Sequence, residues 1–368
     1  MAKKHLNDLS CAARKTLPSM QQGFVLLATL FALVVIGIMA GYFAQRVAQI
    51  RDAAQTEVDA IAAETDFASF RAQLSYAANV SVITARGLEQ GAVDIEVREA
   101  QFNRRRLLLD GTAYTLDKAT KVLVQDLRGL VSINFAPEPV LRRFLSVWNV
   151  PENQHNALID AVADYIDADD FKRLNGAEAV QYRELGLPPP ANSVLITVDE
   201  LGQIPVWREL LAELDKKPGT KDTFLAEITA GRQLGINPNT APRRVIAAIE
   251  AFEPKSIDAF MAARQRGEIA APDNLLPFLR AKTDFDTVAL FPSREWRLQF
   301  DRSALPFLLK CTLWLQSASV VQPARTLDCH RQKRAADLPA KLPSEVAVEP
   351  NELAPPREFP IDLVRTGA

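Results

Sequence analysis

The segment Phe24–Ala44 constrains this chain more than any other feature of its sequence. Its 21 residues carry no charge, and its polar side chains are those of Thr29 and Tyr42. As an α-helix that rises about 1.5 Å per residue it would reach about 31 Å, which matches the hydrocarbon core of a bilayer. The sequence therefore predicts one membrane-spanning helix near the N-terminus.

A short basic leader precedes the apolar segment. It holds four cationic residues, Lys3, Lys4, Arg14 and Lys15, against the single acid Asp8. Cationic residues beside a membrane span favour the cytosolic side. We therefore expect a single-pass protein of the cell inner membrane, with its N-terminus in the cytoplasm and the bulk of the chain in the periplasm.

The leader meets the apolar segment at Gly23-Phe24, and no clear small-residue cleavage site follows the apolar run. A Gly in this place resembles the site cut by prepilin peptidases. The resemblance implies that residues 1–23 are removed after Gly23, that Phe24 becomes a methylated N-terminus, and that the apolar helix is retained. An uncleaved signal anchor with Gly at this position is the alternative.

The fifth residue after this junction is Ala28, where most pilin-like subunits carry Glu. In such filaments the carboxylate pairs with the terminal amine of a neighbouring subunit, because an unpaired charge in an apolar core costs about 2.5–3.5 kcal/mol. A subunit without the acid cannot neutralise a subunit stacked ahead of it, which predicts a place at a filament tip. Alternatively, Ala28 is an apolar residue of an anchor that never enters a filament.

The chain remains helical beyond the span but becomes amphipathic. Apolar residues recur at spacings of three and four from Val47 to Ala62, and no Pro or Gly interrupts Tyr42–Arg86. We expect one continuous helix of about 45–60 residues from Phe24, within residues 24–82. Its apolar stripe would pack on the chain's own folded domain, on neighbouring helices, or in a dimeric coiled coil.

The rest of the chain is long enough for two domains. Extended patterns in residues 83–131 and 285–333 flank residues 132–284, where the apolar spacing is helical. Strands, helices and strands in this order predict an α+β fold, in which a small pilin-like sheet domain is interrupted by a large all-α insertion domain. Residues 334–368 are rich in proline and lack an apolar period, which predicts a disordered tail.

Charge and cysteine content narrow the function classes. The formal net charge is −2, which gives no electrostatic reason to expect nucleic acid as a partner. Cys11 lies in the leader, which leaves Cys311 and Cys329. An oxidising compartment permits a disulfide between them, worth about 3 kcal/mol in the chain-entropy model. Two free buried thiols fit the sequence equally well.

An acidic cluster lies within the predicted insertion. Its members are Asp160, Asp164, Asp167, Asp169, Asp170 and Glu178, which follows a Gly turn. The first three recur at i, i+4 and i+7, and like charges at this spacing destabilise a helix unless a cation or water offsets them. Converging carboxylates suit a hard cation such as Ca2+, although the spacing is not that of an EF-hand. A solvated acidic face ending in an Asx-rich turn is the alternative.

Two segments, Ile133–Pro137 and Ile236–Pro242, share an Asn followed by Pro, and each predicts a capped helix start. The second is similar to the opening of helix-hairpin-helix DNA-binding units, so a membrane-tethered DNA-binding or DNA-uptake protein is an alternative function. Against it, no Gly-hydrophobic-Gly hairpin follows and the surrounding block is not basic. A tethered metal-dependent hydrolase built on Asp164, Asp167 and Asp169 is a further alternative, but no His stands at ligand spacing.

Taken together, these residues resemble the minor pseudopilin called protein K of type II secretion systems. The resemblance covers about residues 20–315 and rests on Gly23-Phe24, Ala28, Gly129–Asn134, Asp164–Asp170, Gly176–Glu178, Pro190–Asn192, Asp199–Leu201 and Ile236–Pro242. It implies no catalytic chemistry but a place at the tip of a short pseudopilus, whose assembly the subunit starts for protein export across the outer membrane. The implied partners are other minor pseudopilins, the prepilin peptidase and the inner membrane. Calcium bound in the helical domain is also implied.

The chain departs from the family pattern at two places. Family members usually carry an acid directly after Gly-Ala-Glu, where this chain has Ala179, and a Thr where it has Phe135-Ala136. Ala179 removes one oxygen ligand from the expected calcium site. The residues that we expect to hold calcium are Asp167, Asp169, Asp170 and Glu178.

Overall fold

The computed structural model describes residues 20–85, 87–89, 106–280, 288–316, 324–333 and 357–358. The predicted leader, apart from its last four residues, lies outside this set, as does the predicted proline-rich tail apart from residues 357–358. The chain separates into two compact units, residues 1–61 and 62–368.

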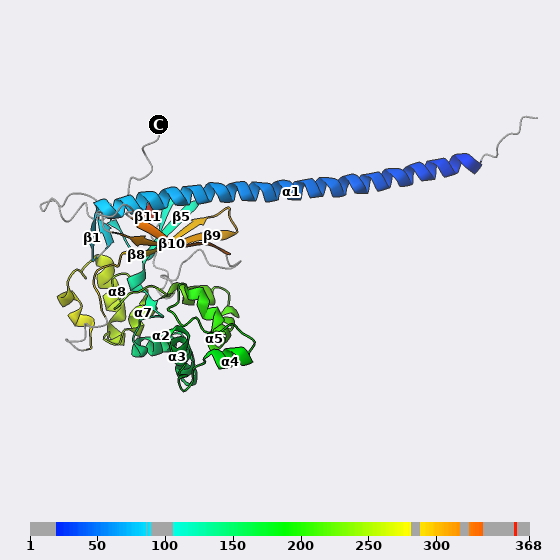
Figure 1. Ribbon diagram of the computed structural model, residues 1–368. Helices are drawn as coiled ribbons and strands as arrows, with labels where there is room; N and C mark the ends of the chain where they lie inside the picture. Colours follow the sequence, from blue (N-terminus) through cyan, green and yellow to red (C-terminus); the bar gives the residue numbers. More distant parts are fainter. Residues whose placement is uncertain are drawn as a thin grey trace, which may run out of the picture. The chain divides into compact units, whose positions relative to one another are not determined.

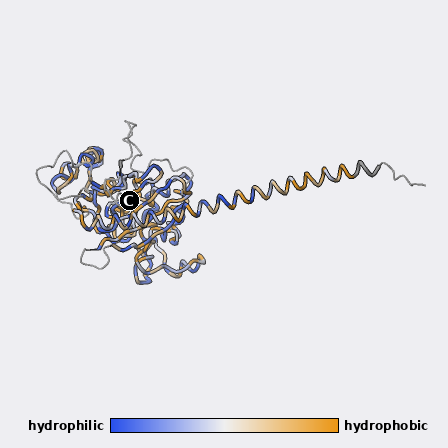
Figure 2. Tube along the Cα trace, turned by 90° about the horizontal axis from the view of Figure 1, so that it is seen from above, coloured by the Kyte–Doolittle hydropathy of each residue, from blue (hydrophilic) through white to orange (hydrophobic). Residues whose placement is uncertain are grey.

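A single helix, α1, runs from Met20 to Val80 and contains 61 residues. The prediction of one long helix is confirmed, and the helix begins at Met20, four residues earlier than expected. Figure 2 shows the N-terminal part of α1 as predominantly hydrophobic and its later part as mixed. This change follows from the sequence, in which charged residues first appear after Ala44.

Unit 62–368 contains a six-stranded sheet with the order β10-β9-β8-β5-β4-β11. Its strands are β4 (Asp110–Asp117), β5 (Thr120–Asp126), β8 (Glu295–Arg302), β9 (Phe307–Leu315), β10 (Ala324–Lys333) and β11 (Arg357–Glu358). All neighbours pair antiparallel except β11, which pairs parallel to β4. The extended patterns at both ends of the predicted insertion thus pair with each other, because β5 lies beside β8.

Strand β11 corrects one prediction. Residues 334–368 were expected to be disordered, yet Arg357 and Glu358 pair with Tyr114 and Thr115 of β4. An edge strand exposes unpaired backbone N–H and C=O groups, which can accept any extended segment that reaches them. A missing apolar period therefore does not exclude a short strand.

The last part of α1 packs on one face of this sheet (Figure 1). Its buried residues recur at spacings of three and four and are Ala63, Phe67, Phe70, Leu74, Ala77 and Ala78. Phe67 lies against Phe300 of β8, with 5.3 Å between the ring centroids. Full burial of such side chains stabilises a fold by about 1.5–3 kcal/mol each, so this seam holds the helix to the sheet.

In the described part of the predicted insertion, the regular elements are helices apart from β7 and Ser132 of β6. Its α-helices are α2 (Glu138–Val147), α3 (Glu152–Ile166), α4 (Ala179–Glu184), α5 (Pro205–Asp215), α6 (Thr220–Ala226), α7 (Arg243–Ala248) and α8 (Ile257–Arg266). Its short 3-10 helices are η3 (Val198–Gln203), η4 (Pro254–Ser256), η5 (Pro272–Asn274) and η6 (Leu276–Phe278), and a further one, η2 (Leu127–Gly129), precedes the predicted insertion. A core of apolar side chains joins them, with Phe224 in contact with both Phe144 and Trp207.

Two small sheets complete the described structure. One consists of β1 (Val82–Thr84), β2 (Gly87–Glu89) and β3 (Arg106–Leu107), which are antiparallel. The other pairs β6 (Val131–Ser132) with β7 (Ile228–Thr229) in parallel. Because β6 directly follows the strand region and β7 lies among the helices, this pair ties the helical segment to the sheet.

Candidate functional site

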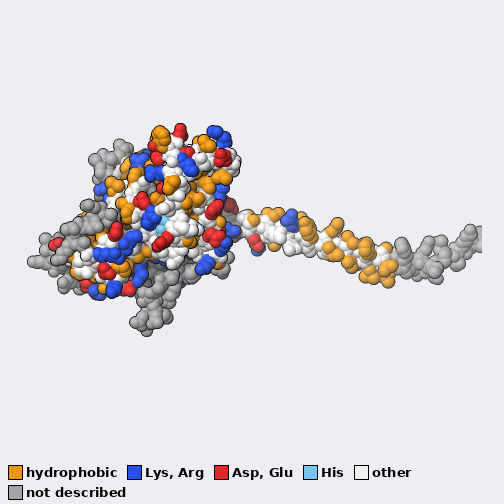
Figure 3. All heavy atoms as spheres, turned by 90° about the horizontal axis from the view of Figure 1, so that it is seen from below, with side chains coloured by type: hydrophobic (Ala, Val, Ile, Leu, Met, Phe, Trp, Pro, Cys, Tyr) orange, Lys and Arg blue, Asp and Glu red, His pale blue; other side chains and the backbone are white. Residues whose placement is uncertain are grey.

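The N-terminal part of α1 is long and apolar enough to cross a membrane. From Val25 onward it contains an 18-residue window with a mean hydropathy of 2.5, and none of that window is buried. Figure 3 shows hydrophobic side chains covering this part of the helix. Ala28 lies there, exposed, as do its neighbours. The finding is compatible with a single-pass membrane anchor.

The acidic cluster forms at the C-terminal end of α3 and in the loop that leads to α4. Asp164 is fully buried, and one of its carboxylate oxygens, Oδ2, accepts the backbone N–H of Arg173 at 3.1 Å. The guanidinium of Arg173 also reaches Asp164, with Nε 3.4 Å from Oδ1. Asp160 accepts hydrogen bonds from the backbone and side-chain amides of Asn175 at 3.1 and 2.9 Å. These two acids therefore hold the loop against α3.

Gly176 permits this close packing. An added Cβ at this position would lie 1.9 Å from Oδ2 of Asp164, a distance that no real Cβ contact shows. Any larger residue would push the loop away from α3. The Gly of the Gly-Ala-Glu motif is thus required by the buried carboxylate beside it.

Glu178 is the least satisfied acid of the cluster. Its side chain is 4% exposed, yet neither carboxylate oxygen has a hydrogen-bond partner. Its backbone N–H, by contrast, is satisfied by Oε1 of Gln181 at 2.9 Å. Burial, followed by the negative charges of Asp164, Asp167, Asp170 and Asp169, raises the pKa of Glu178 to about 7. Glu178 is therefore a buried acid whose charge no group in the described part of the chain neutralises.

The remaining predicted ligands lie at the rim of this cluster. Asp167 ends α3, and its Oδ1 is buried without a partner. Burial and the charge of Asp169 raise the pKa of Asp167. Asp169 accepts the backbone N–H of Phe171 at 2.8 Å, as expected for an Asx turn, and Asp170 is exposed.

The donor set, but not its spacing, fits a hard cation. Unpaired carboxylate oxygens on Glu178 and Asp167, together with the unpaired hydroxyl of the buried Tyr182, are the oxygen donors that Ca2+ prefers. Among the described residues, however, no three His, Cys, Asp or Glu side chains converge closely enough to hold an ion as they stand. The loop would have to move inward to complete a coordination shell.

A second buried acid, Asp126, occupies the junction between sheet and helices. It is fully buried at the end of β5 and accepts five hydrogen bonds, donated by the N–H and hydroxyl of Ser293, the N–H of Arg128, the hydroxyl of Thr240 and the amide of Asn237. Burial raises its pKa, and these hydrogen bonds oppose the shift.

This network removes the basis of the DNA-binding alternative. The motif that resembled a helix-hairpin-helix opening places Asn237 and Thr240 on Asp126, with both side chains buried to 1% exposure or less. Buried amides and hydroxyls that are already bonded cannot reach a phosphate backbone. The helix that follows, α7, begins at Arg243 without a side-chain cap, so the predicted capping role was wrong.

The predicted cap of α2 was also wrong, because the side chain of Asn134 is hydrogen-bonded elsewhere. Asn134 does not cap α2, which starts after Pro137 without a side-chain hydrogen bond. Its amide instead donates to the carbonyls of Leu195 and Ala230 at 2.9 and 2.8 Å, and its oxygen accepts the N–H of Leu195. The side chains of Asn134 and Asn237 therefore join segments that are distant in the sequence, and neither caps a helix.

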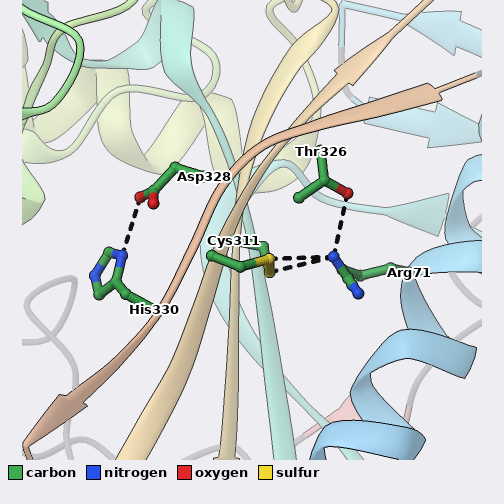
Figure 4. The surroundings of a disulfide bond; sticks show 6 residues. Arg71, Cys311, Thr326, Asp328 and His330 are labelled. Carbon is green, nitrogen blue, oxygen red and sulfur yellow. Dashed lines mark hydrogen bonds and ion pairs between the residues drawn. A yellow bond between two sulfur atoms is a disulfide. The ribbon is translucent and has the colours of Figure 1, made fainter.

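The structure joins Cys311 and Cys329 in a disulfide. The two residues are directly opposite each other on β9 and β10. Figure 4 shows Arg71 of α1 pointing at this disulfide, with Asp328 and His330 on the other side of the strand. Of the two arrangements that the sequence left open, the structure has the bridge.

Three residues that contribute to these sites were not predicted from the sequence. No local sequence pattern marks Asp126 as a site residue, because its hydrogen-bond partners lie up to 167 residues away. Arg173 stands among acids and was not assigned to them, although a cation nine residues after Asp164 is a recognisable signal. Arg71 could not have been found, because its sulfur contacts lie 240 and 258 residues away.

One family model matches part of this chain. Residues 115–216 match the family model described as type II secretion system (T2SS), protein K, which confirms the resemblance over this segment. Among solved structures, a chain of the GspK-GspI-GspJ complex from the enterotoxigenic Escherichia coli type 2 secretion system matches with 13% identity and a TM-score of 0.48. That match covers 78% of this chain and 100% of the other. No curated protein matches the sequence.

Proposed function

We propose that this chain belongs to the type II secretion protein K family and is a minor pseudopilin that caps the tip of the pseudopilus and starts its assembly. The observation that carries the proposal is the family match over residues 115–216. It lies outside the apolar helix, so it is independent of the argument from hydropathy.

The N-terminal helix supplies the membrane anchor in this proposal. Prepilin peptidase would cut after Gly23, and the new N-terminus at Phe24 would be methylated. The basic leader keeps that end in the cytoplasm and sends the rest of the chain to the periplasm. The exposed apolar surface of α1 from Val25 supports this role, because lipid would cover it.

Ala28 supports the position at the tip. A subunit stacked ahead of this one would bury its terminal amine near residue 28, where no carboxylate is present to pair with it. The large helical segment carried on the sheet would also obstruct a following subunit. Both features favour assembly beneath this subunit only.

A second apolar stripe on α1 supports minor pseudopilins as partners. In unit 62–368 the buried seam of α1 faces the sheet, whereas Ala68, Ala72 and Tyr76 recur every four residues outside that seam and are exposed. In unit 1–61 the exposed apolar residues Val47, Ile50, Val58 and Ile61 recur at similar spacing. Such a stripe suits packing against the helices of other subunits.

Calcium is the proposed ligand of the acidic cluster. It would be held by Asp167, Asp169, Asp170 and Glu178, and the support for it is the set of unpaired carboxylate oxygens on Glu178 and Asp167. When bound, the ion would supply charge neutralisation and would fix the loop between α3 and α4. We assign no catalytic reaction to the protein.

A matched pair of variants tests the partner role. Val58→Glu places a charge on the exposed apolar stripe, and Thr56→Glu places the same charge on another exposed face of α1. The tagged full-length protein, extracted in detergent from cells that make the other minor pseudopilins, should retain these partners in the Thr56 variant and lose them in the Val58 variant. Export should fail in parallel. Retained partners and normal export with Val58→Glu would contradict the proposal.

The tip position has its own test. Ala28→Glu should be tolerated in the membrane anchor, because one acid near the end of the helix can be paired by a terminal amine. The account predicts that this variant becomes incorporated beneath further subunits, which cross-linking to the major subunit on both sides would detect. Unchanged placement at the end of the filament would weaken the role given to Ala28.

A further inference from the structure

The disulfide between Cys311 and Cys329 lies at the open edge of the six-stranded sheet. Among the described strands β10 is the outermost, and it pairs with β9 on its inner side. Cys311 on β9 is 3% exposed, whereas Cys329 on β10 is exposed. A thiol arriving from solvent would therefore meet the sulfur of Cys329 first.

The guanidinium of Arg71 lies close to both sulfur atoms of the disulfide. Nη1 of Arg71 lies 3.1 Å from Sγ of Cys329, 3.5 Å from Sγ of Cys311 and 3.1 Å from Oγ1 of Thr326 (Figure 4). Arg71 forms no ion pair with a carboxylate in the described part of the chain, and its Nε is buried without a partner. Burial lowers the pKa of this guanidinium.

Two neighbouring arginines on this face are already paired with carboxylates. Arg331 of β10 pairs with Glu64 of α1 at 2.8 Å, and Arg302 of β8 pairs with Asp66. Asp328 and His330 form a pair on the opposite face of β10 (Figure 4). Among the described residues, Arg71 is the cation with hydrogen-bond contacts to both sulfur atoms.

We propose that Cys329 is the entry sulfur for thiol–disulfide exchange and that Arg71 stabilises the thiolates formed when this bond is made or broken. The co-reactant belongs to the class of dithiol oxidoreductases, which reach an exposed edge strand more readily than a covered one. A nearby cation lowers the pKa of a cysteine thiol and so favours the thiolate, which is the form that reacts. The inference does not depend on the function proposed above.

The exchange balances without a further reactant. In reduction, a thiolate of the oxidoreductase attacks Sγ of Cys329, the bond to Cys311 breaks, and Cys311 leaves as a thiolate beside Arg71. The second thiol of the oxidoreductase then attacks its own sulfur in the mixed disulfide and releases Cys329 as a thiolate. The oxidoreductase ends as a disulfide, and the protons of its two thiols pass to solvent or to the two cysteines. Oxidation follows the same steps in reverse.

Rates of reduction test the role of Arg71. The full-length protein in detergent is treated with dithiothreitol at fixed pH, quenched with acid and alkylated, and the reduced fraction is measured by mass spectrometry. We expect Arg71→Met to slow reduction about fivefold, because the departing thiolate loses its cation. Arg71→Lys and the control Arg331→Met, which breaks a neighbouring pair on the same face, should stay within about twofold of the original rate. An unchanged or faster rate in Arg71→Met would overturn the proposal.

Two further readouts separate this role from a structural one. Limiting glutathione should form its mixed disulfide on Cys329, and an adduct mainly on Cys311 would contradict the assigned entry point. In the reduced protein, the pH profile of alkylation should give Cys329 a pKa below that of a free thiol, rising in Arg71→Met and recovering in Arg71→Lys. The same pH profile of alkylation in the original protein and in both Arg71 variants would contradict the proposal. Unaltered circular dichroism of each variant shows that it is folded.

Discussion

Asp126 and Glu178 are both buried carboxylates, but the protein surrounds them in opposite ways. Asp126 is fully buried and accepts five hydrogen bonds from four residues. Glu178 is 4% exposed, and its carboxylate accepts none. Burial alone therefore does not show whether the protein itself supplies hydrogen-bond partners for an acid.

The difference lies in what offsets the cost of burial. A buried charge is costly unless hydrogen bonds or an opposite charge stabilise it. At Asp126 the protein supplies the donors itself, which makes this acid a junction between the sheet and the helical segment. At Glu178 the nearest charges are other acids, and they raise its pKa further. The proposal that calcium binds at this cluster rests on an acid of the second kind.

Removal of Asp126 should have the largest effect. Asp126→Ala leaves buried donors on Ser293, Thr240 and Asn237 without an acceptor, and each costs about 1–3 kcal/mol unless water replaces it. We expect the free energy of unfolding of the full chain in detergent to fall by about 3 kcal/mol, measured by urea titration with tryptophan fluorescence. Asp117→Ala, which removes an exposed turn acid, is the control. Equal effects of the two changes would remove the basis of the comparison.

Calcium should have the next largest effect, and it should act through Glu178. At one hundred times its Kd, a ligand stabilises a protein by about 2.7 kcal/mol, which raises the Tm of a chain of this size by about 3–4 °C. Glu178→Gln should abolish this rise, whereas Glu184→Gln, at an exposed position of the same helix, should retain it. Calorimetry with and without a chelator provides the measurement. A full calcium response in Glu178→Gln would show that the ion, if bound, lies elsewhere.

The packing between Gly176 and Asp164 gives a smaller test of the same cluster. Gly176→Ala must displace the buried carboxylate, since the new Cβ would lie 1.9 Å from it. Overpacking of this kind costs about 1–3 kcal/mol. Gly202→Ala, where an added Cβ meets nothing within 4 Å, should be nearly neutral in the same urea titration. If both variants unfold alike, the loop is not held as described.

Glu227 is a third buried carboxylate, intermediate between the two. It is 2% exposed, pairs with Arg244 at 3.0 Å and accepts a hydrogen bond from Trp148, yet burial raises its pKa to about 7. The folded state then holds its proton between pH 4.5 and 7 while the unfolded state releases it, so stability falls as pH rises through this window.

The variant Glu227→Gln should flatten that dependence, by at most about 1.4 kcal/mol per pH unit. Urea titrations of the full chain at pH 5, 6 and 7 give the slope for each protein. Glu178 and Asp126 contribute slopes of the same sign, so the variant should retain part of the dependence. A slope that stays the same in Glu227→Gln would show that this acid is ionised throughout.

The sequence predicted the elements whose patterns are local. Helix α1 follows from uninterrupted apolar spacing, and strands β8 and β9 follow from alternation of apolar residues. Strand β10 was not recognised individually, because it is an edge strand with charged residues and little burial on either face. The pairing of β11 with β4 depends on an open edge and not on its own sequence.

The site could be predicted only in part for a similar reason. The acids of the cluster were visible because they lie within 19 residues, from Asp160 to Glu178. Their unequal roles were not, since burial of Asp164 and isolation of Glu178 depend on how the loop folds back on α3. Asp126 was invisible, because its donors converge from three separate segments of the chain.

The mass of the mature N-terminus tests the central claim, that this chain is a processed pseudopilin. The full protein is isolated from membranes of cells with and without prepilin peptidase, and its N-terminal peptide is measured by mass spectrometry. The account predicts a polypeptide that begins at methylated Phe24 when the peptidase is present and retains its leader when the peptidase is absent. A polypeptide that begins at Met1 in both cells, or downstream of Gly41, would contradict it.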